Sequence, residues 1–420
     1  MRVLLVEDDH AIVRALTDLL EGEGFAVRSC ATQDGACAAL ATDDFDIALL
    51  DVTLAQGNGF AVCAAARETA EHAANGWLGR LPGTRGTTVC VTDFGARGDD
   101  RVSDTEAILR AMEAAGEGGT VLFPAGTFYC AELRVPSHCS LLSMTTWGFD
   151  GSGATVLVRN TRSASCILDL TEVEDVVIGG ISVDTLGKTA QTEVDAIRIV
   201  NSRRVDIAGG KLTTGYRGRA VYVENSSRVT VRGAMLANSS YGVEAVSGEE
   251  LLIADCWLTG CHPAGYYGHG TVRQVRLTAN RIEWCGTGAL LEGVSEHTAE
   301  GNYFDRCTVG GIRAVGGGGL RLCGNINQRN GVTKGTDESC NVYLDGVTGA
   351  EYRGNVMEAI RGDGADTNVS PEYAMILRGL RNSRIVGNTA YKGYVAQLLL
   401  DYGGHRDTEI AGNPGTAYAR

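Results

Sequence analysis

Proline, lysine and long apolar runs are all scarce in this chain of 420 residues. Six prolines against 57 glycines indicate many tight turns between short elements. No apolar run approaches the roughly 18 residues that a membrane-spanning helix needs. The formal charge of −14 and the pI near 5.0 argue against nucleic acid or an anionic membrane as the main partner.

Paired cysteines are also lacking. The 13 cysteines are an odd number and do not follow zinc-type spacing, so reduced thiols in a cytoplasmic protein are the simplest expectation. The N-terminal stretch "MRVLLVEDD" becomes acidic after six residues, which is unlike a secretory signal. We therefore predict a cytoplasmic location, and leave export of the larger C-terminal part open.

The first 69 residues alternate between strand and helix patterns. "RVLLVEDD", "AVRSCA" and "DIALLDVTLAQGNGF" contain apolar strands, whereas "HAIVRALTDLLEGEGF" and "GACAALATDDF" have helical spacing. This alternation predicts a parallel sheet. Glu7, Asp8 and Asp51 follow two of its strands and should converge at one edge. Three carboxylates repel one another unless a divalent cation neutralises them, and hard oxygen ligands favour Mg²⁺.

"LLVEDD" and "LLDVTLAQGNGF" resemble the receiver domain of bacterial response regulators. The resemblance implies that Asp51 is the phosphoacceptor and that a histidine kinase is a partner. It also implies that Asp8, Asp51 and the carbonyl of Thr53 hold Mg²⁺, with Glu7 acting through water. Ala55 stands where the family usually has proline.

The resemblance ends near residue 69, before the two further strands and the lysine that the family uses. The first lysine of this chain is Lys188. We therefore interpret 1–69 as a truncated receiver-like α/β segment. It is either a relict of a gene fusion or a working phosphorelay switch. Residues 70–86 lose periodicity and are interpreted as a linker.

The stretch "VTDFGARGDDRVSDTEAILRAMEAAGEGGTVLFPAGTFYC" resembles the entry motif of the pectate-lyase-like superfamily. The resemblance implies a right-handed parallel β-helix over 87–420, sealed at its N-terminal end by a helix. Ser103 or Asp104 would cap that helix, which begins near Thr105. We assign Asp93 and its acidic neighbours to loop structure rather than to catalysis.

An eight-residue pattern predicts a solenoid without reference to any family. It recurs as "VVIGGISV", "VDIAGGKL", "VTVRGAML", "LLIADCWL", "VRLTANRI", "HTAEGNYF", "LRLCGNIN", "AEYRGNVM", "SRIVGNTA" and "TEIAGNPG". Most repeats start 22 to 25 residues apart, and a period near 23 with alternating apolar residues is typical of one solenoid turn. The predicted fold class is therefore mainly β, with the truncated α/β segment in front.

Two columns of identical residues follow from this register. The sixth pattern position predicts a ladder of stacked amides at Asn280, Asn302, Asn325, Asn355, Asn388 and Asn413. The position ten residues after three successive starts holds Cys261, Cys285 and Cys307. A zinc or redox site is one interpretation of the thiols. We favour buried apolar packing.

A second strand precedes each repeat start, and alternation divides its residues between two faces. The inward column is predicted to be Ile199, Val223, Ala245, Leu291, Ala314, Leu344 and Leu377. Their neighbours would then form an exposed face that contains carboxylates, tyrosines and arginines. We predict that a polysaccharide or oligosaccharide binds there through Arg198, Tyr222, Tyr266, Arg313, Tyr343 and Arg378.

The carboxylates of this face are candidate catalytic groups. Glu224 and Glu244 lie on adjacent turns but two residues out of step, which predicts a separation of roughly 8 Å and suits an inverting glycoside hydrolase. Glu292 and Asp345 are two turns and about 10 Å apart. The bland alternative is that a strand surface needs polar residues for solubility.

Comparison with the polygalacturonases of this superfamily makes hydrolysis of that type doubtful. Their clustered aspartates are reduced here to Asp195, and "GHG" with His269 comes one turn late. Lyases and epimerases on such a fold need a base near a uronate α-carbon and a cation for its carboxylate. His269 with Tyr266 or Tyr267, and Arg313, are candidates for these roles.

The sequence thus leaves three functions open. The first is a glycoside hydrolase or polysaccharide lyase that acts along the exposed strand face. The second is a β-helix that binds a glycan or a partner without catalysis, and the third is a phosphorelay regulator that uses Asp51. No cofactor is predicted for the β-helix, and either a monomer or a trimer fits.

Overall fold

The computed structural model describes residues 2–43, 45–51, 54–59, 61–63, 86–143, 154–161, 163–333, 335–358, 371–391 and 399–413. The chain divides into two compact units, Met1–Pro82 and Gly83–Arg420, and each is considered by itself. The predicted linker 70–86 lies outside the described residues except for Gly86. Among the described helices, none has the length and apolarity required to cross a membrane.

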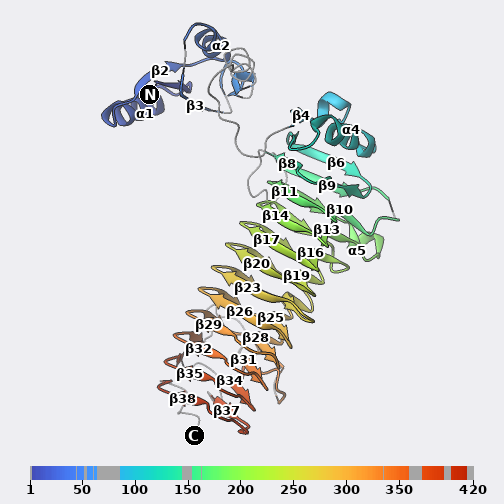
Figure 1. Cartoon of the computed structure of the whole chain (residues 1–420), viewed down its shortest axis with the longest axis vertical. Coiled ribbons are helices and arrows are strands. Elements are labelled where there is room, and N and C mark those ends of the chain that lie inside the picture. The colour runs from blue at the N-terminus through green and yellow to red at the C-terminus, as the bar shows by residue number, and fades with distance from the viewer. Residues whose placement is uncertain are drawn as a thin grey trace. The chain divides into compact units, whose positions relative to one another are not determined.

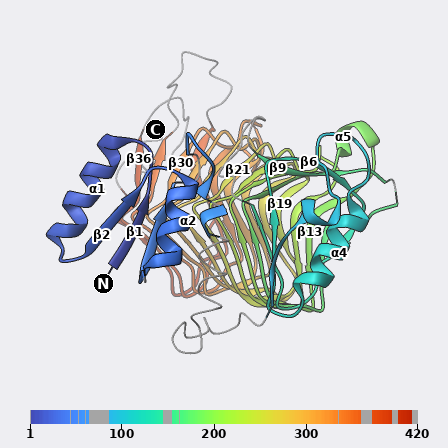
Figure 2. The same ribbon diagram turned by 90° about the horizontal axis from the view of Figure 1, so that it is seen from above.

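The first unit, here called the receiver-like unit, is a three-stranded parallel sheet with the order β2-β1-β3. Its elements are β1 (Arg2–Val6), α1 (His10–Gly22), β2 (Ala26–Cys30), α2 (Gln33–Thr42) and β3 (Ile47–Leu50). Figure 2 shows α1 and α2 on opposite faces of the sheet. This arrangement confirms the predicted strand–helix alternation.

The two faces of this small sheet are covered unequally. Leu4 and Val6 of β1 pack with Ala36 and Ala39 of α2 in a buried cluster. On the side of α1, Val3 and Leu5 of β1 are also buried, yet no described residue of α1 itself is buried. The side chain of Asp9 caps the N-terminus of that helix. The core is therefore more complete on the α2 side than on the α1 side.

The second unit is a β-helix built from three long parallel sheets, seen in Figure 1 as successive turns coloured from cyan to red. We call them sheets I, II and III. Sheet I contains β7 (Leu133–Arg134), β10 (Cys166–Thr171), β13 (Asp195–Val200), β16 (Arg219–Glu224), β19 (Tyr241–Ala245), β22 (Ala264–Gly268), β25 (Thr287–Glu292), β28 (Gly310–Val315), β31 (Cys340–Asp345), β34 (Tyr373–Arg378) and β37 (Leu399–Asp401).

Sheets II and III complete each turn, so that the chain runs from a strand of sheet III through sheet I to sheet II. Sheet II contains β4 (Thr88–Cys90), β5 (Thr120–Phe123), β8 (Ser140–Ser143), β11 (Glu174–Gly179), β14 (Arg203–Ala208), β17 (Ser226–Arg232), β20 (Gly248–Ala254), β23 (Arg273–Thr278), β26 (Ser295–Glu300), β29 (Arg321–Cys323), β32 (Glu351–Arg353), β35 (Arg384–Val386) and β38 (Glu409–Ala411). Sheet III contains β6 (Gly126–Cys130), β9 (Thr155–Arg159), β12 (Ile181–Asp184), β15 (Lys211–Thr213), β18 (Met235–Ala237), β21 (Trp257–Thr259), β24 (Arg281–Glu283), β27 (Tyr303–Asp305), β30 (Ile326–Gln328), β33 (Val356–Glu358) and β36 (Thr389–Tyr391).

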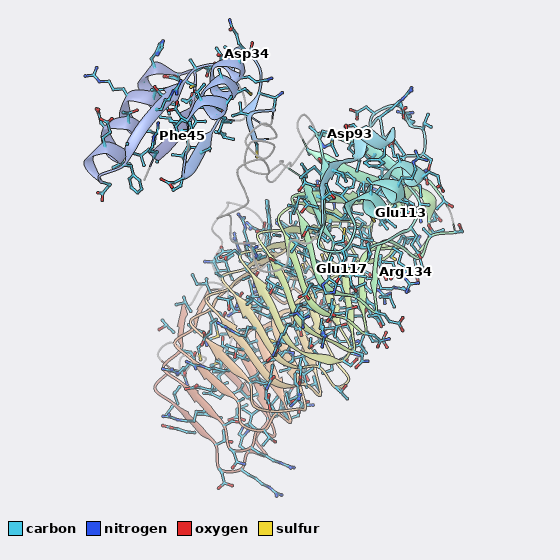
Figure 3. The ribbon with its side chains drawn as sticks, turned by 45° about the horizontal axis from the view of Figure 1, so that its top comes forward. Asp34, Phe45, Asp93, Glu113, Glu117 and Arg134 are labelled. Carbon is cyan, nitrogen blue, oxygen red and sulfur yellow. The ribbon has the colours of Figure 1, made fainter. Side chains whose placement is uncertain are left out.

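Helix α4 (Thr105–Ala115) covers the N-terminal end of the β-helix, next to the short 3-10 helix η1 (Val91–Phe94). Its apolar side is buried through Ile108 and Met112. Asp104 occupies the capping position, but its carboxylate accepts hydrogen bonds from the backbone of Arg97 and Tyr129 instead. Figure 3 labels Asp93 of η1 and Glu113 of α4 on these capping elements. The short helix α5 (Gly187–Ala190) follows β12.

The asparagine ladder is confirmed. In each of five successive steps, the Nδ2 of one asparagine donates to the Oδ1 of the asparagine in the next turn, at 2.9 to 3.0 Å. The same Oδ1 also accepts the backbone N–H of the preceding asparagine. Every buried amide therefore finds partners inside the stack, and this explains why one residue type recurs.

The cysteine column is a packing feature. Cys261, Cys285 and Cys307 are fully buried. Each thiol approaches a backbone carbonyl of the preceding turn, at 3.6 to 3.9 Å. Burial raises the pKa of the Cys285 thiol, so this group stays protonated and weakly reactive. After Cys307 the column continues as Asn330 and Asn341, which repeat the amide hydrogen bonds.

The inward column of sheet I is also confirmed. Strand registers place Ile199, Val223 and Ala245 opposite one another, and Leu291, Ala314, Leu344 and Leu377 follow in the same row. Gly268 fills the one position between Ala245 and Leu291. All seven predicted side chains are buried. The opposite face of sheet I is therefore the exposed face predicted to carry the site.

Candidate functional site

A cleft of about 570 Å³ opens on sheet I, where β13, β16 and β19 lie side by side. The residues of its lining that matter here are Asp195, Arg198, Arg217, Arg219, Tyr241 and Glu244. Alternation directs Arg198 and Glu244 away from the core. Asp195, Arg219 and Tyr241 are instead the first residues of β13, β16 and β19, each two residues before an inward side chain, so they reach the cleft at the start of sheet I. The turn between sheets III and I that precedes β16 supplies Arg217.

Arg219 holds two acids of the cleft together. Its Nε and Nη2 donate to the two oxygens of Asp195, at 2.7 and 2.6 Å, and its Nη1 donates to Oε2 of Glu244 at 3.1 Å. Arg198 adds a third guanidinium contact to Asp195 at 3.2 Å. Although burial alone lowers the pKa of Arg219, its bonds to Asp195 and Glu244 raise that pKa overall. Both carboxylates are therefore fixed in position by ion pairs.

Glu244 also contacts a histidine. Its Oε1 lies 3.1 Å from Nε2 of His269, whose side chain is partly exposed. An ionised carboxylate only accepts hydrogen bonds, so Nε2 carries the proton and the lone pair of the neutral ring is at Nδ1. The pair thus has the arrangement of an oriented general base.

Two tyrosines stand beside this pair. The ring of Tyr267 stacks on that of His269, with 4.2 Å between centroids, and on that of Tyr241, with 5.1 Å. The hydroxyl of Tyr267 donates to Oε2 of Glu292 at 2.6 Å. Burial, followed by the hydrogen bond to Glu292, raises the pKa of Tyr267, and burial raises that of Tyr241. Both phenols therefore remain proton donors at neutral pH.

Glu224 lies on the same side of the cleft but has a different partner. Tyr222 donates to its Oε2 at 2.8 Å. Burial and this bond raise the pKa of Tyr222 to about 12. The guanidinium of Arg219 lies 4.0 Å from the centre of the Tyr222 ring, a cation–π contact that completes the wall of the cleft.

A second polar group lies further along sheet I, between β28 and β37. Tyr343 donates to Asp345 at 2.9 Å, and Arg378 lies 3.5 Å from the same carboxylate. Arg313 packs over the ring of Tyr343, at 4.2 Å from its centre. Tyr402 donates to Asp337 at 2.7 Å. This group is separate from the cleft and contains no histidine among its contacts.

The predicted site residues therefore fall into two sets. Glu244 and His269 are in contact, and Glu292 joins them through Tyr267. Glu224 is bonded to Tyr222, whose ring lies against Arg219. Asp345, Arg313, Tyr343 and Arg378 belong to the second group. The predicted offset of Glu224 and Glu244 is confirmed, because Glu224 lies opposite Val200 whereas Glu244 lies opposite Tyr222.

The predicted outward position of Tyr266 is wrong. Tyr266 is opposite Val243 and Ala289 in the inward rows, and its side chain is fully buried. Its hydroxyl lies 2.9 Å from Nε2 of His297 inside the β-helix. The ring fits because Gly268, the next inward residue, has no side chain. A Cβ at Gly268 would lie 2.6 Å from the Tyr266 hydroxyl. Tyr267 takes the outward position instead.

Three cleft residues were missing from the predicted site: Arg217, Arg219 and Tyr241. Two of them had a signal in the register. Strands "DAIRIVN" and "RAVYVEN" align with Ile197 opposite Val221, which puts Asp195 level with Arg219, and Arg219 is itself opposite Tyr241. Arg217 lies in a turn, where the strand count gives no direction.

The receiver-like unit brings its three acids together as predicted. One oxygen from each of Glu7, Asp8 and Asp51 lies within 4.8 Å of the others. Asp8 also accepts the backbone N–H of Ala55, and Glu7 that of Asp9. Three carboxylates at this spacing fit the oxygen donor set of Mg²⁺. Thr53, the predicted carbonyl ligand, lies outside the described residues.

Three protein families match parts of the chain. The family described as "Right handed beta helix region" matches 190–327 and 219–413, together more than half of the 420 residues. "Response regulator receiver domain" matches 3–74. "Rhamnogalacturonase A/epimerase, pectate lyase-like" matches 88–135, the entry and capping segment.

Individual proteins agree with this division. The alginate biosynthesis transcriptional regulatory protein AlgB of Pseudomonas aeruginosa is 39% identical over 66 residues, or 16% of this chain, and this chain spans only 15% of that protein's length. The A-module of the mannuronan C-5 epimerase AlgE4 of Azotobacter vinelandii has a TM-score of 0.51 at 15% identity, covering 77% of this chain and all of that module. The Dettilon tailspike protein has a TM-score of 0.57 at 14% identity, covering 77% of this chain and 68% of its own. At such identities these structures establish the fold.

Proposed function

This chain belongs to the right-handed β-helix family, and on that premise we propose that it is a polysaccharide lyase that cleaves a uronate-containing glycan bound along sheet I. One observation carries the proposal. An imidazole oriented by a carboxylate, His269 with Glu244, is stacked against a protonated phenol, Tyr267. A base and a proton donor held side by side are what an elimination next to a uronate carboxylate requires.

The proposed reaction begins with proton abstraction. Nδ1 of His269 takes the proton from the carbon next to the uronate carboxylate, and Glu244 stabilises the imidazolium that forms. The electron pair of the broken C–H bond becomes a carbon–carbon double bond. The bond to the glycosidic oxygen breaks, and this oxygen takes a proton from the hydroxyl of Tyr267. Glu292, which accepts that proton's hydrogen bond in the free protein, orients the phenol.

The carbon acid needs a cation near the substrate carboxylate, because negative charge develops there. Arg217 is exposed, lines the cleft and forms no ion pair with any described residue. Arg219 and Arg198, in contrast, already bind Asp195. Arg217 is therefore the guanidinium that we assign to the uronate carboxylate, in place of the predicted Arg313, which belongs to the second polar group.

The hydrogen bonds favour elimination over hydrolysis. A glycoside hydrolase needs one protonated carboxyl group and one carboxylate. Asp195 and Glu244 are bound by guanidinium groups, whereas Glu224 and Glu292 accept hydrogen bonds from phenols. None of these hydrogen bonds is donated by a carboxyl group, whereas burial raises the pKa of the Tyr267 phenol, which keeps its proton.

The test is the product formed from a panel of neutral and uronate polysaccharides. We expect an unsaturated uronate, detected by its ultraviolet absorbance, from a uronate polymer. His269→Gln should lower kcat by a factor on the order of 10² to 10⁴, the usual contribution of a general base. The matched control is His138→Gln. This histidine contacts Glu174 and Asp175 at sheet II, outside the proposed site, so the variant should retain activity.

Other products would identify the alternatives. Reducing ends without ultraviolet absorbance would overturn the lyase in favour of a hydrolase. Glycan binding without any turnover would leave a binding module. Exchange of the C–H proton with solvent without cleavage would indicate an epimerase, which shares the first step.

We also propose that the receiver-like unit binds Mg²⁺ through Glu7, Asp8 and Asp51. The convergence of the three carboxylates supports it. The cation would neutralise their mutual repulsion, as in a site prepared to accept a phosphoryl group on Asp51. Calorimetric titration with Mg²⁺ alone tests this proposal, and an Asp8→Asn variant that binds equally well would contradict it.

A further inference from the structure

The corner where sheet III turns into sheet I has an unusual backbone. One residue of this corner in each turn has a left-handed conformation: Tyr216, Asn238, Gly260, Trp284, Arg306 and Arg329, with φ between 48° and 68°. Asparagine and glycine adopt this region readily. Bulky aromatic residues rarely do, and such strain concentrates at functional positions. Tyr216 and Trp284 are therefore the two residues of the column that need an explanation.

Backbone hydrogen bonds define the spacing of this column. The N–H of Tyr216 donates to the carbonyl of Asn238, and that of Asn238 donates to Thr259. Gly260 continues the series to Glu283, directly before Trp284. Tyr216 and Trp284 are thus three turns apart, or about 14 Å at the usual strand spacing.

We define the aromatic corner as Tyr216, His262 and Trp284. Tyr216 and Trp284 are 46% and 52% exposed, among the most exposed large apolar side chains described. His262 lies between them, also exposed, with its ring 6.5 Å from that of Tyr216. Exposed rings on neighbouring turns of one corner form a surface that a flat or elongated ligand can cover.

Both ends of the aromatic corner are held in place. The hydroxyl of Tyr216 donates to Oδ1 of Asn238 at 2.9 Å. At the other end, the guanidinium of Arg306 packs against the ring of Trp284 at 4.9 Å. Arg306 is in turn fixed by Asp305, a buried carboxylate that also binds Arg329. An exposed ring with a buried ion pair behind it loses little freedom when a ligand binds.

The aromatic corner is continuous with the cleft, because Tyr216 belongs to the lining of both. We propose that the aromatic corner is an accessory binding site for the glycan chain, contacted by sugar units that extend from the cleft toward Trp284. The C–H face of a pyranose ring packs against an aromatic ring, and its hydroxyl edge stays in water. A nucleic acid could also stack, but the net charge of −14 disfavours a polyanion of that density.

This inference rests on the proposed function, because it requires that one polymer occupies both the cleft and the aromatic corner. It predicts that KM depends on the length of the oligosaccharide. Short oligosaccharides fill only the cleft, whereas longer ones also reach Trp284. Trp284→Leu, which retains apolar area but removes the aromatic face, should raise KM for long oligosaccharides about tenfold, the value of one stacking contact. It should leave kcat, and KM for the shortest substrate, unchanged. Trp284→Phe should restore most of the affinity.

A second readout does not require turnover. Trp284 is far more exposed than Trp257, and the part of the iodide quenching that is lost in Trp284→Phe reports on Trp284 alone. A long oligosaccharide should protect against this quenching in the unmodified protein and not in Trp284→Phe. Binding with protection but no cleavage would refute the lyase and support the aromatic corner. Cleavage with equal KM values for Trp284→Leu at every chain length would refute the aromatic corner and leave the lyase intact.

Discussion

The two units of this chain use parallel strands in opposite ways. In the β-helix, each sheet I strand from β10 to β34 has a hydrogen-bonded neighbour on both sides, and its inward residues lie in one continuous core. In the receiver-like unit, β3 pairs with β1 only, and Ile47 and Leu49 are exposed. Repetition thus gives every strand backbone partners and a core, whereas among the described residues the three-stranded sheet leaves its edge strand β3 partly exposed.

The difference also separates the two kinds of site. The cleft on sheet I is assembled from side chains of several turns, so its geometry depends on the register of the whole stack. The acids of the receiver-like unit come from the ends of two adjacent strands and need only β1 and β3. The first site is a product of long-range order, and the second survives truncation of its sheet. Variants of the asparagine ladder and of the buried His297 should therefore change the stability of the β-helix. Variants of the cation site and of Leu49 should affect only the receiver-like unit.

The largest effect should follow from breaking the asparagine ladder. Asn325→Ala removes the acceptor of the Asn302 backbone N–H and side-chain amide, and both remain buried. Because each unsatisfied buried donor costs about 1 to 3 kcal/mol, the free energy of unfolding should fall by about 4 kcal/mol. Denaturant titration measures the change. Asn160→Ala, at an exposed asparagine, is the control and should change stability by less than about 0.5 kcal/mol. Equal effects would mean that the stack does not depend on its amides.

A smaller, pH-dependent effect should come from His297, which interrupts an apolar column of sheet II between Val275 and Leu320. Burial lowers its pKa to about 4, from 6.5. As the pH falls from 6.5 toward 4, the unfolded chain takes up a proton that the folded chain excludes. Stability present above pH 6.5 should therefore decrease by about 3 kcal/mol over this interval. Urea titrations at several pH values measure the loss.

The control for this prediction replaces both buried polar groups. His297→Leu combined with Tyr266→Phe restores an apolar column without an unpaired hydroxyl, and should flatten the pH dependence between 6.5 and 4. The partly exposed His138 offers the matched change, because His138→Leu leaves the buried pair intact. If the double variant retained the full slope, other groups would account for the acid sensitivity.

These buried residues indicate how much of the β-helix the sequence could predict. The asparagine ladder, the thiol column and seven inward positions of sheet I were predictable because stacking repeats one environment in every turn. Tyr266 was assigned to the wrong face because "YYGHG" contains two successive tyrosines. Neither of the two alternating sets of residues in this stretch is clearly apolar, so the pattern does not show which tyrosine points inward. Two features decide the inward position of Tyr266: the space left by Gly268 and the hydrogen bond to His297. Residues of different repeats make this contact, and the periodicity of the sequence does not predict it.

The site was predictable only in part, for a related reason. Counting strand residues placed Glu244 on the outward face, whereas His269 was a candidate from "GHG" alone, and its contact with Glu244 comes from the structure. Arg217 was not predicted, because a turn residue has no fixed direction. Asp345 was grouped with the other acids because it shares their face, although three turns and a different set of hydrogen bonds separate it from His269.

A metal ion should stabilise the receiver-like unit alone. At a Mg²⁺ concentration 100 times its dissociation constant, binding raises the free energy of unfolding by about 2.7 kcal/mol. We expect the gain in the unfolding transition of this unit, followed by hydrogen exchange of β1 amides, with no change in β22. Asp8→Asn should abolish it, whereas Asp18→Asn, on the surface of α1, should not. A gain of the same size in both variants would place the cation elsewhere.

The smallest effect should distinguish the two faces of the receiver-like sheet. Leu49 is 38% exposed on the side of α1, whereas Leu4 is 0% exposed on the side of α2. Leu49→Ala should therefore change the stability of this unit by less than about 0.5 kcal/mol, and Leu4→Ala should cost about 2 to 5 kcal/mol. Hydrogen exchange of β1 amides measures both. If Leu49→Ala proved as costly as Leu4→Ala, some other part of the protein would have to cover β3, because the described residues bury Val3 and Leu5 on that face but leave Leu49 partly exposed. The edge of the receiver-like sheet would then be covered in solution, and the two units would differ in what covers their strands rather than in whether the strands are covered.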